Sequence, residues 1–219
     1  LFPLTQLHGP IGRVLVPFLS RIQTEPGKYR STYTEAVSLI MIATQPGILF
    51  AIVCAPQLFE LLFGNQWVPA APIFQWLGVA ALHQVMTSTI GWLFLSQGRG
   101  SDFFKLGAYT AVATIASFII GLPWGAVGVA ASYTVMNYVV LLPLAWVSAG
   151  RCGPVSCDDL VRLAIPHAAA ILATAAALKT VQYNLQSIGI IRMAALVILA
   201  YFAYLCIILL FDTKRELLV

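Results

Sequence analysis

Charged residues are scarce in this chain, and their scarcity excludes most soluble folds. Only 9% of the 219 residues are Asp, Glu, Lys or Arg, whereas soluble domains carry about a quarter. A water-soluble domain cannot cover its surface with so few charges. The net charge of +4 comes from basic residues that are scattered along the chain, which argues against nucleic-acid binding.

Cysteine is also sparse. The four cysteines are too few and too dispersed for a disulfide framework, so we expect reduced thiols; they are Cys54, Cys152, Cys157 and Cys206. Cys152 and Cys157 have CxxxxC spacing, but no second pair of ligands follows them. We therefore predict no metal site and no cofactor.

Catalytic motifs are missing as well. The sequence holds no Gly-rich phosphate loop and no HExxH motif, and its acidic residues lie outside the apolar runs or at their ends. His83 and Ser88 are five residues apart, so they point about 140° apart on one helix and cannot act as a base and nucleophile pair. We predict no catalytic residue, no enzyme activity and no carboxylate relay for protons or sodium in this part of the protein.

Long apolar runs are what the sequence does contain. Hydrophobic residues make up 60% of the chain, and its mean hydropathy is +0.88. A helix of about 20 apolar residues crosses a bilayer. Six windows of that kind are complete: Ala36–Ala55, Val68–Leu95, Phe104–Gly121, Ala126–Val147, Ala164–Val181 and Ile190–Phe211. A seventh, Phe2–Ser20, contains His8 and Arg13 and is predicted to be part of a span.

The basic residues fall mainly in alternate connections, which predicts the orientation. Lys and Arg in short loops are retained on the cytoplasmic side, and only Lys179 and Arg192 fall on the other side. The C-terminal tail is therefore predicted to be cytoplasmic, and Pro56–Trp67, Leu122–Gly125 and Gln182–Gly189 to be external. The loops are too short for a soluble catalytic domain, so the chain is expected to act within the bilayer.

These windows give a division along the chain. Residues 1–147 form one group of spans, 148–163 a cytoplasmic loop, and 164–219 two further spans and a tail. Because the sequence begins with Leu1 rather than Met, we expect a piece of a longer protein.

Arg13 is the first candidate for substrate binding. It lies two turns before Ser20, about 10 Å below the cytoplasmic end of its helix. A planar guanidinium in a cavity is suited to bind a phosphate or another anion. The alternative is that this long side chain extends to the nearby interface.

A polar stripe on the second complete span is the next candidate. His83, Gln84, Thr87 and Ser88 fall on one face of a helix. That face either lines a hydrophilic cavity or forms hydrogen bonds with neighbouring helices, and a single histidine is more often an interhelical donor than a ligand.

Two further polar residues lie inside spans. Asn137 repeats this geometry beside the small residues Gly125 and Gly128, which favours helix packing. Gln45 precedes Pro46 and Gly47, which are predicted to interrupt their helix. Transporters use such breaks near binding sites, although a static kink is the alternative.

Four segments resemble, in order, motifs of one family. Pro10–Gln23, PIGRVLVPFLSRIQ, resembles the "P-x-L-S-R" helix end, and Leu62–Leu77, LFGNQWVPAAPIFQWL, resembles "fG-x-x-W-x-x-A". Leu95–Arg99, LSQGR, resembles a "G-R" turn, and Gly121–Ala131, GLPWGAVGVAA, resembles a tight external turn. This order resembles the Wzx-like polysaccharide flippases of the multidrug, oligosaccharidyl-lipid and polysaccharide exporter superfamily. The resemblance covers Pro10 to Tyr138.

The resemblance implies an all-α polytopic membrane helix bundle, here the C-terminal lobe of a MATE-like two-lobe transporter. The family moves undecaprenyl-diphosphate-linked oligosaccharide across the bacterial inner membrane by alternating access, for surface or exopolysaccharide export. The implied partners are that lipid-linked substrate, the bilayer, the N-terminal lobe of the same protein and other polysaccharide-assembly membrane proteins.

The same resemblance implies a cationic cavity, which only Arg13 matches within a span here. Ser20, Arg21 and Arg99 match motif letters and are expected to shape helix ends. Three other functions stay open: a flippase for a lipid-linked peptidoglycan precursor, a MATE-type drug exporter, and, less favoured, a membrane-embedded glycan polymerase or transferase.

Overall fold

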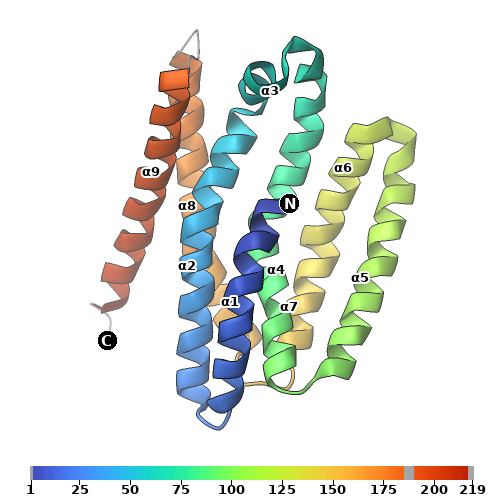
Figure 1. Ribbon diagram of the computed structural model, residues 1–219, viewed down its shortest axis with the longest axis vertical. Helices are drawn as coiled ribbons and strands as arrows, with labels where there is room; N and C mark the ends of the chain where they lie inside the picture. The colour runs from blue at the N-terminus through green and yellow to red at the C-terminus, as the bar shows by residue number, and fades with distance from the viewer. Residues whose placement is uncertain (1, 185–189, 217–219) are drawn as a thin grey trace. The chain divides into compact units, whose positions relative to one another are not determined.

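The computed structural model describes residues 2–184 and 190–216, and every regular element in these ranges is a helix (Figure 1). This confirms the predicted all-α class. The α-helices are α1 Phe2–Arg21, α2 Pro26–Val53, α3 Ala55–Phe63, α4 Ala71–Ser96, α5 Gly100–Gly121, α6 Gly125–Met136, α7 Leu142–Gly150, α8 Cys157–Asn184 and α9 Ile190–Glu216. Short 3₁₀ helices cover Asn65–Ala70 and Leu122–Trp124, and a π-helical turn, Asn137–Leu141, joins α6 to α7.

Five helical stretches are long and apolar enough to cross a membrane: Pro26–Val53, Asn65–Ser96, Gly100–Gly150, Cys157–Gln182 and Ile191–Phe211. The third of them folds back on itself at Leu122–Trp124, because α5 and α6 pack as a hairpin (Figure 1). Each of its arms exceeds the roughly 20 residues that a crossing needs. The protein is therefore a multi-pass membrane helix bundle.

Two local features differ from the sequence pattern. α2 runs without interruption through Pro46, so the predicted break in this helix is wrong. The residues after Pro56, read from the sequence as loop, begin with the short helix α3, which has proline in its first turn. Proline suits that position because the first turn of a helix has N–H groups without intrahelical partners.

The helices form two compact units, each built from segments far apart in sequence. Unit 1 holds residues 1–40 and 83–161, and unit 2 holds 41–82 and 162–219. In unit 1 two tyrosines on successive turns of α2 are fully buried against α4. The Tyr29 hydroxyl lies 2.5 Å from Ser96 Oγ, and the Tyr33 hydroxyl lies 3.2 Å from Thr89 Oγ1.

Arg99 holds one end of unit 1 together. Its guanidinium donates to the carbonyl oxygens of Ser148, Ala149 and Cys152 at 3.0 to 3.2 Å, and Nε pairs with Asp102 at 3.1 Å. These carbonyls lie at and just after the end of α7, where backbone acceptors lack intrahelical partners. The structure thus confirms the expectation that Arg99 shapes a helix end.

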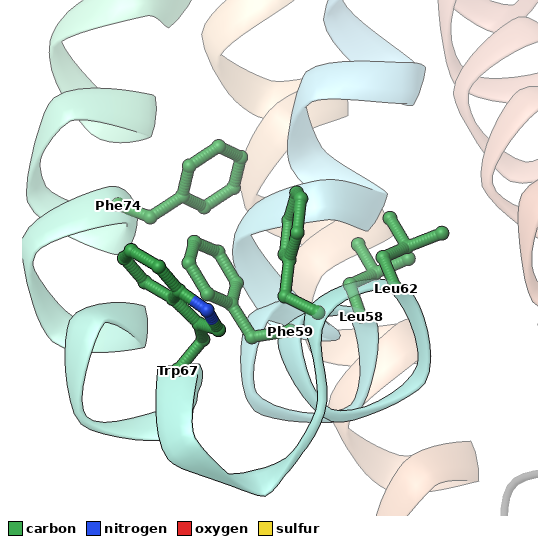
Figure 2. A pocket seen from close by; sticks show the side chains of 6 residues that line it. Leu58, Phe59, Leu62, Trp67 and Phe74 are labelled. Carbon is green, nitrogen blue, oxygen red and sulfur yellow. The ribbon is translucent and has the colours of Figure 1, made fainter.

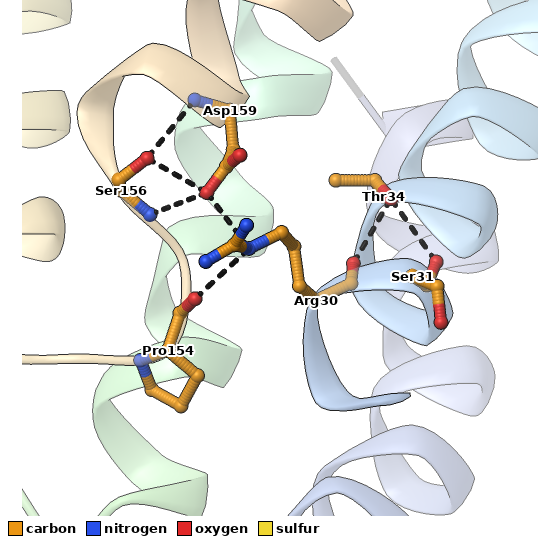
Figure 3. A network of polar contacts seen from close by, with 6 residues as sticks. All are labelled: Arg30, Ser31, Thr34, Pro154, Ser156 and Asp159. Carbon is orange, nitrogen blue, oxygen red and sulfur yellow. Dashed lines mark hydrogen bonds and ion pairs between the residues drawn. The ribbon is translucent and has the colours of Figure 1, made fainter. Parts of the chain in front are cut away.

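A second network at this end of unit 1 fixes the start of α8 (Figure 3). The Ser156 N–H donates to Asp159 Oδ2 at 2.8 Å, and the Asp159 N–H donates to Ser156 Oγ at 3.2 Å. This reciprocal pair is a capping box, in which two backbone donors of the first helical turn are satisfied. Arg30 of α2 lies 3.1 Å from the same Asp159 oxygen and donates to the Pro154 carbonyl.

Unit 2 packs part of α2 against α8 and α9. Its core contains Leu49 and Phe50 of α2, Leu178 of α8, and Leu196 and Ala200 of α9. Within the same unit α2 also meets α4, because the Gln75 amide donates to the Ile52 carbonyl at 3.0 Å.

Candidate functional site

The stripe predicted on α4 divides into two parts. Its first part contacts α6 and the π-helical turn that follows it: the rings of His83 and Tyr138 have centroids 4.6 Å apart, and Gln84 Nε2 donates to the Tyr133 hydroxyl at 3.2 Å. We call these four residues the α4–α6 seam. Gln84 thus forms the interhelical hydrogen bond of the second alternative, which polar groups in membrane bundles commonly adopt, and His83 packs its ring against that of Tyr138.

The second part of the stripe forms hydrogen bonds to the backbone of α4. The Thr87 hydroxyl donates to the Gln84 carbonyl at 3.3 Å and the Ser88 hydroxyl to the Val85 carbonyl at 3.2 Å. Thr87 is half-buried and Ser88 is exposed. A polar face on an apolar helix therefore begins inside unit 1 and ends at its surface.

Asn137 is buried in the π-helical turn beside the seam. Its side-chain amide donates to the Tyr133 carbonyl at 2.8 Å, within its own helix. A π-turn widens the helix by one residue and often lies at functional positions. Here it places Asn137 in the interior of unit 1, as the packing interpretation predicts, and brings Tyr138 onto the seam.

Arg13 lies exposed on α1. The residue before it, Gly12, packs closely on Trp92 of α4. A Cβ atom added to Gly12 would lie only 2.7 Å from Trp92 Nε1. Trp92 is one helical turn beyond Ser88, so α1 crosses α4 where the polar stripe ends. Among the described residues Arg13 has no ion pair, which leaves its charge available.

Gln45 belongs to unit 2, where it is 1% exposed. Its Nε2 donates to the Leu82 carbonyl at 3.0 Å, and its Oε1 accepts from the Tyr204 hydroxyl. The same hydroxyl lies 2.6 Å from His167 Nδ1. The sequence prediction missed His167 and Tyr204, although a histidine and a tyrosine inside apolar spans are the signal for such a site.

Unit 2 also contains an apolar pocket of about 490 Å³ (Figure 2). Figure 2 shows the rings of Phe59, Trp67 and Phe74 gathered around it, with Leu58 and Leu62 beside them. Phe59 and Phe74 meet edge to face with centroids 5.4 Å apart. Aromatic side chains of this kind concentrate where membrane helices meet the water interface, and this pocket offers room for hydrocarbon.

The predicted residues are thus only partly brought together. Unit 1 joins His83, Gln84, Thr87, Ser88 and Asn137 around α4 and α6, and α1 with Arg13 packs at the end of that stripe. Gln45 belongs to a separate network in unit 2. The described residues contain no group of three His, Cys, Asp or Glu that could hold a metal ion.

Comparison with known proteins agrees with the motifs in the sequence. A family model described as "Polysaccharide biosynthesis protein" matches residues 1–72. The lipopolysaccharide biosynthesis protein WzxC of Escherichia coli K12 is 28% identical over 148 residues, which cover 64% of this chain and 30% of that protein. An uncharacterized membrane protein in the cps region of Klebsiella pneumoniae is 25% identical over 131 residues, 58% of this chain and 27% of its own.

No solved structure matches the chain significantly. The chain spans less than a third of the length of these two relatives. Together with the all-α, multi-pass architecture, the matches confirm the resemblance carried by the four motifs. Over these residues the chain is similar to the Wzx-like polysaccharide flippases.

Proposed function

We propose that this chain is part of a transporter that moves undecaprenyl-diphosphate-linked oligosaccharide from the cytoplasmic to the external leaflet of the bacterial inner membrane. It would form the C-terminal lobe of a two-lobe protein that works by alternating access and catalyses no reaction. The C-terminal tail would be cytoplasmic.

The polar face of α4 carries this proposal. Polar residues such as Thr87 and Ser88 are costly on a helix face that meets lipid, even when their hydroxyls bond to carbonyls of the same helix. A surface that borders a hydrophilic cavity removes that cost. The seam with α6 supports the face from behind, since His83 and Gln84 fix α4 against Tyr138 and Tyr133.

Arg13 is the proposed diphosphate ligand. It is exposed on a helix that packs where the stripe ends, and guanidinium forms bidentate, charge-assisted hydrogen bonds with phosphate oxygens. Basic groups of the N-terminal lobe would complete the site, and the sugars would occupy the polar cavity. The polyprenyl tail would stay in lipid.

The test is complementation by the full-length protein in a bacterium that lacks its own polysaccharide flippase. Surface glycan and the lipid-linked repeat units that accumulate in its absence are both measured. We expect glycan to return and the intermediates to clear. If the intermediates persist despite normal membrane expression, the cargo is wrong, and a lipid-linked peptidoglycan precursor becomes the next one to test.

The Arg13→Ala variant tests, in the same assay, whether Arg13 binds the diphosphate. We expect surface glycan to fall at least tenfold, because one lost charge-assisted pair is worth about 1.5–3 kcal/mol. Arg21→Ala is the matched control, since Arg21 is an exposed arginine at the end of the same helix. Equal glycan from both variants at equal expression would remove Arg13 from the site.

A further inference from the structure

The apolar pocket of unit 2 has no part in the proposed transport site. Its lining comes from α3, the 3₁₀ helix after it and the first turn of α4 (Figure 2): Leu58, Phe59, Leu62, Phe63, Trp67 and Phe74. These described residues expose no polar atom to its volume of about 490 Å³. A polar ligand would lose its water there without gaining a hydrogen bond, so the pocket suits hydrocarbon.

A turn at Gly64 builds this pocket. Gly64 has a φ angle of +88°, a conformation that glycine adopts without strain. Its N–H donates to the Glu60 carbonyl at the end of α3, and the Trp67 N–H donates in turn to the Gly64 carbonyl, both at 3.0 Å. The chain therefore reverses, and the ring centroid of Trp67 lies 6.4 Å from that of Phe63.

The aromatic rings form a continuous wall. The centroids of Phe63 and Phe59 are 5.5 Å apart, and those of Phe59 and Phe74 are 5.4 Å apart. Aromatic pairs at such separations attract each other. The wall thus joins three consecutive helical elements, and the cavity is already formed without an occupant, as ligand pockets of this size usually are.

The pocket lies where two membrane-spanning stretches are connected. Pro26–Val53 ends just before α3, and Asn65–Ser96 includes both Trp67 and Phe74. Trp67 is 53% exposed, and Leu77, one turn after Phe74 on α4, is 40% exposed. Because exposed aromatic residues concentrate at the membrane–water interface, the rim of the pocket is placed at the depth where lipid acyl chains begin.

The charges at this end of unit 2 favour an anionic lipid. Among the described residues they are Glu60 on α3, Lys179 on α8 and Arg192 on α9, all exposed. Leu58 of the pocket packs on the core that contains Leu178 and Met193, which are the sequence neighbours of the two basic residues. Arg192 has other interactions in the protein, so Lys179 is the cation available to a headgroup at the rim.

We propose that the pocket binds one acyl chain of an anionic bilayer phospholipid, whose headgroup lies beside Lys179. The volume suits a single acyl chain, whereas an undecaprenyl chain is several times longer and could place only part of itself there. The bound lipid fixes α3 at the membrane surface. The inference goes beyond the proposed function, because this lipid is not the cargo.

Quenching of tryptophan fluorescence by brominated acyl chains tests the proposal. The full-length protein is reconstituted in unlabelled phospholipid vesicles that contain increasing fractions of brominated phosphatidylglycerol. The difference between wild type and Trp67→Phe isolates the emission of Trp67. The difference between wild type and Trp124→Phe isolates a matched tryptophan, which is 71% exposed in the turn between α5 and α6.

We expect Trp67 to be half quenched at a lower fraction of brominated lipid than Trp124, because a pocket binds the chain more tightly than an open surface does. Equal curves would overturn the proposal. Failure of any brominated lipid to quench Trp67 would also overturn it, since the rest of the protein would then cover the pocket.

Two neighbouring leucines of α3 give a matched pair of variants. Leu62 lines the pocket and Leu61 does not, and both are exposed, so neither replacement disturbs the core. Leu62→Gln places an amide at the rim and should move the Trp67 curve toward that of Trp124. Leu61→Gln should leave the curve unchanged. The same result in both variants would contradict binding in the pocket.

Lys179→Gln tests the headgroup. In the wild type, brominated phosphatidylglycerol should half-quench Trp67 at about a fivefold lower fraction than brominated phosphatidylcholine does, as expected for one basic residue near the membrane surface. Lys179→Gln should remove that preference, and Arg162→Gln, an exposed arginine at the other end of α8, should keep it. A preference that survives in Lys179→Gln, or is absent from the wild type, would overturn the assignment.

Unlabelled polyprenyl phosphate distinguishes a bilayer lipid from the carrier lipid. It should restore the emission of Trp67 no better than unlabelled phosphatidylglycerol does. If it is the better competitor, the pocket binds the carrier chain and the proposal is wrong. Transport is not measured in these experiments, so their failure is distinct from failure of the proposed function in complementation.

Discussion

Gly128 of α6 packs on Gly121 of α5 at backbone contact. A Cβ on Gly128 would lie 2.6 Å from the Gly121 carbonyl oxygen, closer than such atoms approach in proteins. Ser132, one turn later, donates to the Ser117 carbonyl at 2.6 Å. Small residues on both helices thus allow a close crossing. In lipid, where the hydrophobic effect does not drive helices together, van der Waals contact at such a crossing holds them together.

Replacement of Gly128 should therefore open the hairpin. Gly128→Ala places a methyl group against backbone that cannot move aside, which costs about 1–3 kcal/mol. We expect a lower unfolding midpoint in detergent and reduced membrane accumulation. Gly107→Ala is the matched control, because Gly107 is also helical and its added Cβ meets no atom within 4 Å. Helix propensity alone would favour alanine at both positions, so equal loss in both variants would show that the close crossing is not responsible.

Arg99 should contribute more to stability than its place in a short loop suggests. Arg99→Ala removes donors from three carbonyl oxygens and leaves the end of α7 uncapped, a loss of about 2–3 kcal/mol. The measurement is thermal unfolding combined with proteolysis of the α7–α8 connection, which should become faster. Asp102→Asn, at a more exposed position of the ion pair, should have a much smaller effect, and a reversed ranking would contradict the capping role.

Tyr133→Phe and Gln84→Leu test whether the α4–α6 seam supports the polar face. Each removes one partner of the bond between Gln84 Nε2 and the Tyr133 hydroxyl. We expect each change to destabilise the protein by about 0.5–1.5 kcal/mol, and the double variant to lose less than the sum. The measurement is a double-mutant cycle on unfolding midpoints, and strict additivity would show that the two side chains do not interact.

Cysteine labelling can determine the orientation that the basic residues predict. Cys152 is exposed, whereas Cys54 is fully buried. In a variant whose only accessible cysteine is Cys152, a membrane-impermeant maleimide should react in inside-out vesicles and not in spheroplasts. A cysteine at exposed Asn65, introduced as Asn65→Cys, should show the opposite pattern. Labelling of Cys152 from outside would invert the proposed topology.

The long helices could be predicted from sequence because a bilayer requires about 20 apolar residues in a row. The hairpin at Leu122–Trp124 could also be predicted, since Pro and Gly interrupt the hydrophobic run there. α3 was missed because a helix of nine residues is too short to show a clear period. The uninterrupted course of α2 through Pro46 depends on packing against other helices, which a local rule for proline does not include.

The candidate site was predicted less completely. The stripe on α4 follows from helical spacing alone, but its division between buried His83 and exposed Ser88 depends on where α6 packs. His167 and Tyr204 are 37 residues apart, and Tyr204 is 159 residues from Gln45. Contacts across such separations depend on tertiary packing, so the local pattern of a single sequence does not predict which residues meet.

The interleaving of the two units constrains the order in which the chain can be assembled. Arg30 meets Asp159, which comes 129 positions later in the sequence, so α2 is synthesised long before the α7–α8 connection that completes unit 1. Residues 41–82 wait longer still, because the rest of unit 2 begins at residue 162. The bond from the Tyr204 hydroxyl to Gln45 Oε1 therefore cannot form until α9 has been synthesised, long after α2.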